Sequence, residues 1–152
     1  MDYQLRAATP EDAGEMARLF TELGHPTTGP EVAGRWRAWA AAGDSAIVAV
    51  APDGRLLGVA TLHRRVPLHH ARVMGRISSL VVDAAARGTG IGRALVEASE
   101  AGLAAAGCTE IELTSHMRRA DAHAFYLHLG YERSSARFVK RLAPANPPGG
   151  LP

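Results

Sequence analysis

The chain has 152 residues, of which 47% are hydrophobic and 21% charged, and a formal net charge of +2 at pH 7. This is typical of one globular domain that needs neither a disulfide nor a metal to fold. The single cysteine excludes an internal disulfide, no apolar run is long enough to span a membrane, and the scattered basic residues form no nucleic-acid patch, so we expect a cytoplasmic protein with neither membrane nor nucleic acid as a partner.

Hydrophobic periodicity in the first half of the chain predicts a strand, two helices and a β-hairpin. Thr9 and Pro10 mark the start of the first helix, with a capping residue followed by a proline at the first helical position. The predicted elements are a strand at 3–8, helices at 10–23 and 30–42, and hairpin strands at 46–50 and 56–62, joined by a turn at 52–54.

The second half predicts strands and helices in alternation. The strand at 74–82 ends in residues that are apolar on both faces, as in a central strand. A glycine-rich loop follows it, and then come a helix at 91–106, a strand at 110–114, a helix from about 119–121 to 130, and short strands at 131–134 and 137–140.

These elements predict an α/β fold whose mixed sheet has about six to seven strands, largely antiparallel, with helices on both faces. Only the two strands around the glycine-rich loop are joined through a helix and so are expected to be parallel. We expect a single domain over residues 1–143 and a Pro/Gly-rich tail over 144–152.

A phosphate-binding site is predicted at the loop after the 74–82 strand. Its glycines can direct N–H groups at one spot, and the N-terminus of the next helix points the same way. The chain has no Gly-Lys pair, which excludes a P-loop. A dinucleotide-binding loop would need glycine at Arg93, although Glu112 lies roughly where a ribose-binding acid is wanted. The loop reads Arg87-Gly88-Thr89-Gly90-Ile91-Gly92-Arg93.

Three segments together resemble the GNAT superfamily of N-acetyltransferases. The loop resembles the Gln/Arg-x-x-Gly-x-Gly/Ala motif of that family. Residues 119–131 are similar to its R-x-x-A-H-x-F-Y-x-x-x-G-[FY] segment, and residues 6–13 to its usual opening. The match runs from about residue 3 to 141, and the loop with the Phe-Tyr helix at this separation is the specific part.

The resemblance implies acetyl-CoA as a co-substrate and a central splayed strand pair that seats it. Main-chain groups of Leu80 and Val82 would bind the pantetheine arm, and the Leu80 N–H would stabilise the oxyanion. Tyr126 would be the general acid that protonates the leaving thiolate. The implied cofactor-binding residues are Leu80, Val82, Arg87, Gly88, Thr89, Gly90, Ile91, Gly92, Arg93 and Arg119.

The general base is left open. Some family members carry a Glu four residues before the Leu80 position, but this chain has Arg76 there. The remaining candidates are a chain of water molecules and the side chains of His63, His69, His70 and His116. No two histidines are spaced i, i+4 and no cysteine cluster accompanies them, so we expect no metal site.

The expected reaction is acetyl transfer to a small-molecule primary amine by direct attack in a ternary complex. Residues 115–126 resemble GNAT enzymes for small amines, including the aminoalkylphosphonate type, and the Leu80 strand end is similar to that of aminoglycoside N-acetyltransferases. Few acids lie in the presumed acceptor segments, and this favours an acceptor with an anionic group. Arg64, Arg65, Arg72 and Arg76 would suit such a group or form a solvated face.

Other assignments stay open. Trp36 and Trp39 would either pack in the core or line an acceptor pocket. The same fold could acetylate a protein N-terminus or a lysine, or serve as a non-catalytic acyl-CoA-binding domain. A homodimer is compatible with the resemblance, since dimers are common in this fold, but nothing in the sequence reports one.

Overall fold

The structure is a computed structural model that describes residues 1–115 and 117–142. The chain divides into two units, Met1–His116 and Met117–Pro152. The strands are β1 (Gln4–Ala7), β2 (Ser45–Val50), β3 (Leu56–Arg65), β4 (Met74–Val82) and β5 (Glu110–Leu113), and the helices are α1 (Ala13–Leu23), α2 (Gly29–Ala41), α3 (Ile91–Ala105) and α4 (Ala120–His128). Short 3-10 turns lie at Pro10–Asp12 and Ala84–Ala86.

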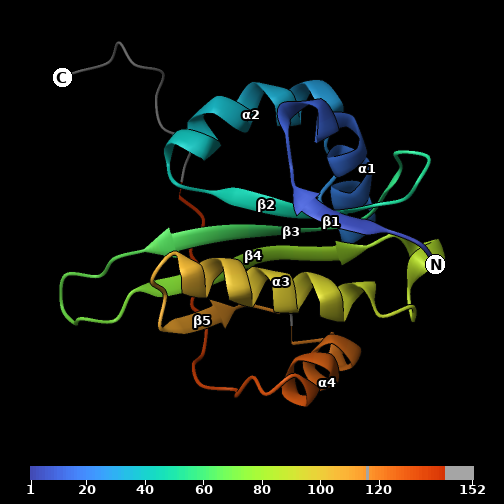
Figure 1. The fold of residues 1–152 in the computed structure, drawn as a ribbon. Helices are drawn as coiled ribbons and strands as arrows, with labels where there is room; N and C mark the ends of the chain where they lie inside the picture. The colour runs from blue at the N-terminus through green and yellow to red at the C-terminus, as the bar shows by residue number, and fades with distance from the viewer. Residues whose placement is uncertain (116, 143–152) are drawn as a thin grey trace, which may run out of the picture. The chain divides into compact units, whose positions relative to one another are not determined.

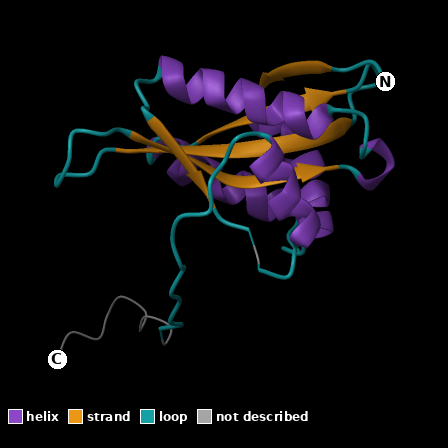
Figure 2. Ribbon diagram, turned by 90° about the horizontal axis from the view of Figure 1, so that it is seen from below, coloured by secondary structure: helices purple, strands orange, loops and turns teal. Residues whose placement is uncertain are grey.

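The first unit is a mixed sheet between helices. Its strand order is β1-β2-β3-β4-β5; the first four strands are antiparallel to their neighbours, and β5 is parallel to β4. Helices α1 and α2 cover one face and α3 covers the other (Figure 1), as the view from below also shows (Figure 2). The predicted fold class and the parallel crossing through α3 are therefore confirmed.

The predicted strand count is wrong. The described residues form a sheet of five strands rather than six to seven, and the segments 131–134 and 137–140 form no strand. Phe138 is 93% exposed and Val139 63% exposed. A β-prone sequence stabilises a strand only through neighbours on a pleated surface, and these side chains have none. The predicted tail at 144–152 lies outside the described residues.

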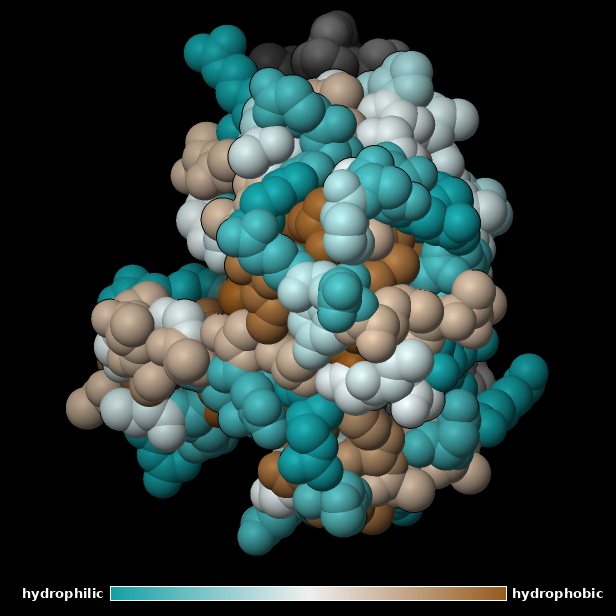
Figure 3. Space-filling view, turned by 45° about the vertical axis from the view of Figure 1, so that its right-hand side comes forward, coloured by the Kyte–Doolittle hydropathy of each residue, from teal (hydrophilic) through white to brown (hydrophobic). Residues whose placement is uncertain are grey.

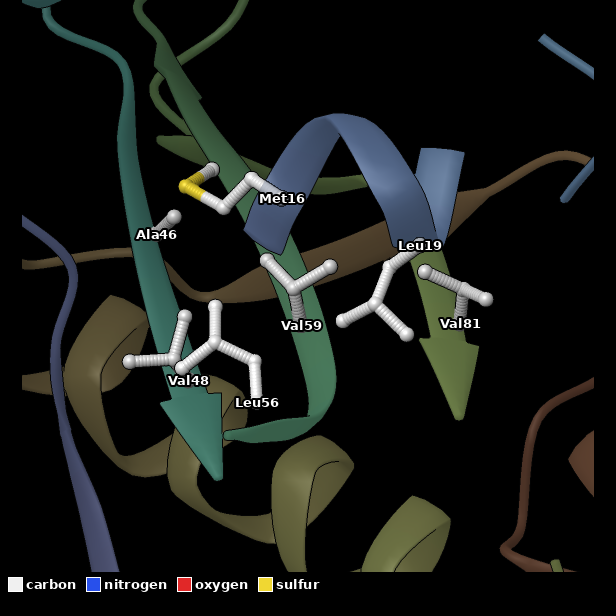
Figure 4. Packing of buried hydrophobic residues seen from close by; sticks show 7 residues of the cluster. All are labelled: Met16, Leu19, Ala46, Val48, Leu56, Val59 and Val81. Atoms are coloured by element: carbon white, nitrogen blue, oxygen red, sulfur yellow. The ribbon is translucent and has the colours of Figure 1, made fainter. Parts of the chain in front are cut away.

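The core holds α1 against the sheet. Met16 and Leu19 of α1 lie over Val48, Val59 and Val81 from three adjacent strands (Figure 4), and all five side chains are at most 5% exposed. Burial of each such side chain contributes about 1.5–3 kcal/mol to folding. The α1 helix is therefore fixed over β2, β3 and β4.

Capping boxes set the start of both N-terminal helical segments. The Asp12 carboxylate accepts the Thr9 N–H at 2.8 Å, and Glu31 does the same for Thr28 at 2.8 Å. Arg6 of β1 also pairs with Asp12 at 2.7 Å, which ties the first strand to the first turn and lowers the pKa of that carboxyl.

The surface mixes polar and apolar side chains. On the side shown in Figure 3, hydrophilic residues interrupt the apolar ones, which is usual because more than half of a protein surface is apolar. Among the described residues, no helix has the length and apolar character needed to cross a membrane.

Candidate functional site

The strands β4 and β5 part halfway along β4. Their pairing runs only from Met74 opposite Glu110 to Ile77 opposite Leu113, whereas β4 continues for five residues to Val82. A bulge at the start of that extension shifts the register with β3. Within the described part of the first unit, no strand pairs with this side of the extension. It therefore presents an open main-chain edge, as the predicted splayed pair requires.

Main-chain groups of Leu80 and Val82 point to that open side. The Asp83 N–H donates to the Leu57 carbonyl of β3 at 2.8 Å. In an antiparallel ladder, residues bonded to the partner alternate with residues whose N–H and C=O point away from it. The register is regular back from Asp83, so the main-chain N–H and C=O of Val81 face β3, whereas those of Leu80 and Val82 face away from it. These are the two residues for which the sequence predicts cofactor contacts.

The loop after β4 leaves a set of N–H groups free. Gly88 and Gly90 have φ of +76° and +87°, where residues with a Cβ are strained, and nothing lies within 4 Å of the Cβ that either lacks. The first bond of α3 runs from the Ala94 N–H to the Gly90 carbonyl, so the N–H groups of residues 91–93 have no helical acceptor. Open space beside free donors fits a diphosphate.

Two close contacts place the N-terminus of α3 beside β4. A Cβ on Gly58 of β3 would lie 2.8 Å from Leu95, and a Cβ on Gly75 of β4 would lie 2.8 Å from Leu103. Glycine at both positions lets α3 pack directly onto the sheet backbone. The helix is thereby held at two points, and its first turn stays next to the end of β4.

Asp83, the first residue after β4, anchors the loop to the rest of the unit. The residue is 2% exposed, and its carboxylate accepts hydrogen bonds from Arg18 and Arg55 at 2.7 Å each and from the Ala85 N–H at 2.9 Å. Burial alone would raise the pKa of Asp83, but these bonds outweigh it and hold the pKa below its usual value.

Glu22 of α1 extends this ion network to the loop itself. It pairs with Arg18 at 3.0 Å and accepts the Ala84 N–H at 3.1 Å. The sequence analysis missed the network. The spacing of Glu15, Arg18 and Glu22 along one helix face predicts pairs on α1, and Glu15 does bind Arg18 at 2.9 Å, but no local pattern links them to residue 83.

The two loop arginines lie against protein groups. The Arg87 Nε donates to the Val82 carbonyl at 3.2 Å and its guanidinium lies 3.9 Å from Glu22, while Arg93 lies 3.7 Å from Glu97 on α3. Arg87 therefore bridges the loop and the strand end, two places where cofactor contacts are predicted. Thr89 braces the same turn through a 2.6 Å bond to the Ala86 carbonyl.

Tyr126 belongs to the second unit, on α4. Its ring packs edge-on against Phe125 and Tyr131, with centroids 5.2 and 5.9 Å apart. Burial raises the pKa of the Tyr126 phenol, and the charge of Arg119, which caps α4, lowers it by less.

The tryptophans and histidines that the sequence offers as site candidates lie in different surroundings. Trp36 and Trp39 are partly buried and pack against the core cluster of α1 and the sheet, so they belong to the core. His69 and His70 are exposed, whereas His63 bonds to Asp44; His116 lies outside the described residues. The described residues bring together no group of three or more His, Cys, Asp or Glu side chains suited to a metal ion.

The four arginines near the end of β3 and the start of β4 all have partners in the chain. Arg72 pairs with Glu110 at 2.9 Å, and Arg76 pairs with Glu112 at 3.3 Å. Arg65 lies 3.7 Å from the same Glu112, and Arg64 donates to the Ala106 carbonyl at 2.9 Å. The β5 acids therefore neutralise much of this basic surface.

Comparison with known proteins agrees with this arrangement. The family model for the acetyltransferase (GNAT) family matches residues 13–131. The chain is 33% identical over 137 residues to an aminoglycoside N(6')-acetyltransferase type 1 of Stenotrophomonas maltophilia, covering 86% of each chain. The solved structure of an acetyltransferase from Trypanosoma brucei is similar with a TM-score of 0.82 and 28% identity, over 93% of this chain and 100% of that one.

A shorter match is closer in sequence. The chain is 41% identical over 90 residues to an aminoalkylphosphonate N-acetyltransferase of Salmonella typhimurium. That match covers 59% of this chain and spans 58% of the length of the relative.

Proposed function

The chain belongs to the acetyltransferase (GNAT) family, and from this premise we propose that it transfers the acetyl group of acetyl-CoA to a primary amine of a small molecule by direct attack in a ternary complex. Two relatives are named for small-molecule acceptors, an aminoglycoside and an aminoalkylphosphonate. The observation that carries the proposal is the open edge of β4 beside a loop with free N–H groups.

Each part of the site has a proposed role toward the co-substrate, which supplies the activated acyl group when it is bound. The N–H groups of residues 88–93 bind the diphosphate, with Arg87, Arg93 and Arg119 adding charge. Leu80 and Val82 bind the pantetheine arm through their outward main-chain groups, and Arg87 leaves the Val82 carbonyl when the arm takes its place. The Leu80 N–H donates to the developing oxyanion.

Tyr126 is proposed as the general acid. The phenol gives its proton to the sulfur as the C–S bond of the thioester breaks. Burial raises the pKa of Tyr126, which keeps the phenol protonated until this step. Among the described residues of the first unit the one tyrosine is Tyr3, which precedes β1.

An acceptor with an anionic group is favoured by the match to the aminoalkylphosphonate enzyme. The arginine cluster does not add to this argument, because Arg72 and Arg76 are each paired with a β5 glutamate. We therefore place zwitterionic small amines first in the acceptor panel and polycationic aminoglycosides second.

A ligand-binding measurement tests the cofactor. Acetyl-CoA at about 100 times its Kd is expected to stabilise the protein by about 2.7 kcal/mol, which raises Tm by several degrees, while NAD at the same concentration leaves Tm unchanged. Stabilisation by NAD and not by acetyl-CoA would contradict the proposal and favour a dinucleotide-binding loop.

A thiol-release assay then tests the reaction. Acetyl-CoA is offered with small amines, with peptides that carry a free N-terminus, and with lysine peptides. Release with small amines is the expected result. Release only with peptides would assign a protein acceptor, and binding without release would assign a non-catalytic acyl-CoA-binding domain.

A further inference from the structure

The amine that attacks a thioester must first lose a proton, and the structure separates the histidines that could take it. His69 and His70 stack on each other in an exposed segment, with ring centroids 4.5 Å apart. His63 near the end of β3 is different. Its Nδ1 lies 3.0 Å from the Asp44 carboxylate, and its side chain is 34% exposed. An Nδ1–H donated to that carboxylate leaves the Nε2 lone pair free to accept a proton.

His63 lies on the face of the sheet that α1 and α2 cover, but beyond their packing, because its side chain is 34% exposed whereas Val59 is fully buried. Gly58 faces α3, so alternate residues of β3 face the other way, and Val59 packs under α1 accordingly. His63 shares the face of Val59, since the two are an even number of residues apart. Because α3 packs directly on the opposite face over Gly58 and Gly75, the partly exposed His63 side chain leaves its own face as the side from which an amine can reach it.

The spacing along the strand separates His63 from the thioester. Ala60 of β3 is the partner of Leu80, where the thioester carbonyl is proposed to bind, and His63 is three residues further along. At about 3.3 Å per residue this is roughly 10 Å between Cα atoms. The thioester binds on the side of β4 that faces away from β3, so its distance from His63 is longer than this, and we expect water to relay the proton from the amine to the imidazole.

The charged side chains near His63 are not suited to act as the general base. Arg76, the cross-strand partner of His63, carries a guanidinium that stays protonated, and it binds Glu112 and, at 3.0 Å, the Thr114 hydroxyl. Arg65 lies 3.7 Å from the same Glu112. That carboxylate therefore already pairs with two guanidinium groups.

We propose that His63 is the general base that deprotonates the acceptor amine, with Asp44 as the positioning residue that fixes the imidazole. The inference rests on the proposed function. The ammonium gives one proton through water to Nε2 of His63, the C–N bond forms as the C–S bond breaks, and the sulfur receives a proton from Tyr126, which regains one from the new amide nitrogen. His63 releases its proton to solvent, so one proton leaves per acetyl group transferred.

The pH profile of His63→Gln tests this base. Near pH 7 the variant is expected to lose about 100-fold in kcat/KM for the acceptor, with the KM for acetyl-CoA unchanged. The deficit should shrink as pH rises towards the pKa of the amine, about 10, because the neutral amine needs no base. Asp44→Asn should show a smaller deficit with the same trend, and imidazole in the buffer should partly restore His63→Ala.

His70→Gln is the matched control and should keep wild-type activity. The acetyl-CoA-induced Tm shift of each variant reports whether that variant is folded. If the His63 variants do not fold, the pH profile of Asp44→Asn provides the test instead. A loss of kcat/KM in His63→Gln that is equal at every pH, or that is below about twofold near pH 7, overturns the assignment of His63 as the base. If the wild type still acetylates amines in that case, the proposed function stands. If the wild type releases no thiol with any amine, the proposed function fails and this inference falls with it.

Discussion

At the scale of single residues, Tyr126 combines a protonated phenol with an apolar setting. Burial raises its pKa above the ordinary value of about 10, so the group is neutral throughout the neutral pH range. Aromatic packing against Phe125 and Tyr131 holds the ring. The motif predicts this residue from its place in the Phe-Tyr pair, whereas the pKa shift depends on which atoms cover the ring.

Replacing Tyr126 by Phe removes the donor and keeps the ring contacts. We expect kcat to fall by about 100-fold, with the Tm shift caused by acetyl-CoA nearly unchanged, because only the proton transfer is lost. Steady-state kinetics and melting curves measure the two effects, and Tyr3→Phe is the matched control. An unchanged kcat would remove Tyr126 from the mechanism.

At the scale of elements, the strand–loop–helix from β4 to α3 depends on backbone geometry more than on side chains. Gly88 and Gly90 occupy the left-handed region, and the first turn of α3 leaves its N–H groups to a ligand. The sequence pattern predicts this element closely, because glycines mark the positions where the backbone adopts a positive φ. The strands predicted at 131–134 and 137–140 failed for the opposite reason, since β-propensity stabilises a strand only beside a partner strand.

Two glycine substitutions in this element should have opposite effects. Gly90→Ala forces a Cβ into φ of +87° at a cost of about 1–2 kcal/mol, and the shifted loop should raise the KM for acetyl-CoA about tenfold. Gly102→Ala, at an exposed position in the C-terminal part of α3 with nothing within 4 Å, should stabilise the protein by about 0.5–1 kcal/mol and leave KM unchanged. Denaturant unfolding and acetyl-CoA titration of both variants measure this, and equal KM values would contradict the role of the loop.

At the scale of the first unit, the ion network around Asp83 joins parts that are distant in the chain. Arg18 comes from α1, Arg55 from the segment between β2 and β3, and Ala85 from the loop. Because the carboxylate is buried, removing its charge leaves two arginines without their common partner. The position of the loop relative to β4 is therefore coupled to the packing of α1.

Asp83→Asn should destabilise the protein by about 2 kcal/mol near pH 7, less than a fully buried pair would lose because both arginines are partly exposed. The folded-state pKa of Asp83 is below its unfolded value, so its contribution is complete above about pH 5 and is lost as pH falls through the folded pKa. Urea unfolding of both proteins across this range should show the gap closing in acid. A constant gap, or an equal loss in the exposed control Asp2→Asn, would contradict this account.

The local sequence determined most of the elements and the glycine loop, because periodicity, capping and φ preferences act over a few neighbouring residues. Only the tertiary structure decided that β4 extends beyond its pairing with β5, so that main-chain groups of Leu80 and Val82 face an open edge. It also decided that Asp83 holds two distant arginines and that His63 meets Asp44. Such contacts depend on strand register and on packing between layers, which no window of neighbouring residues encodes.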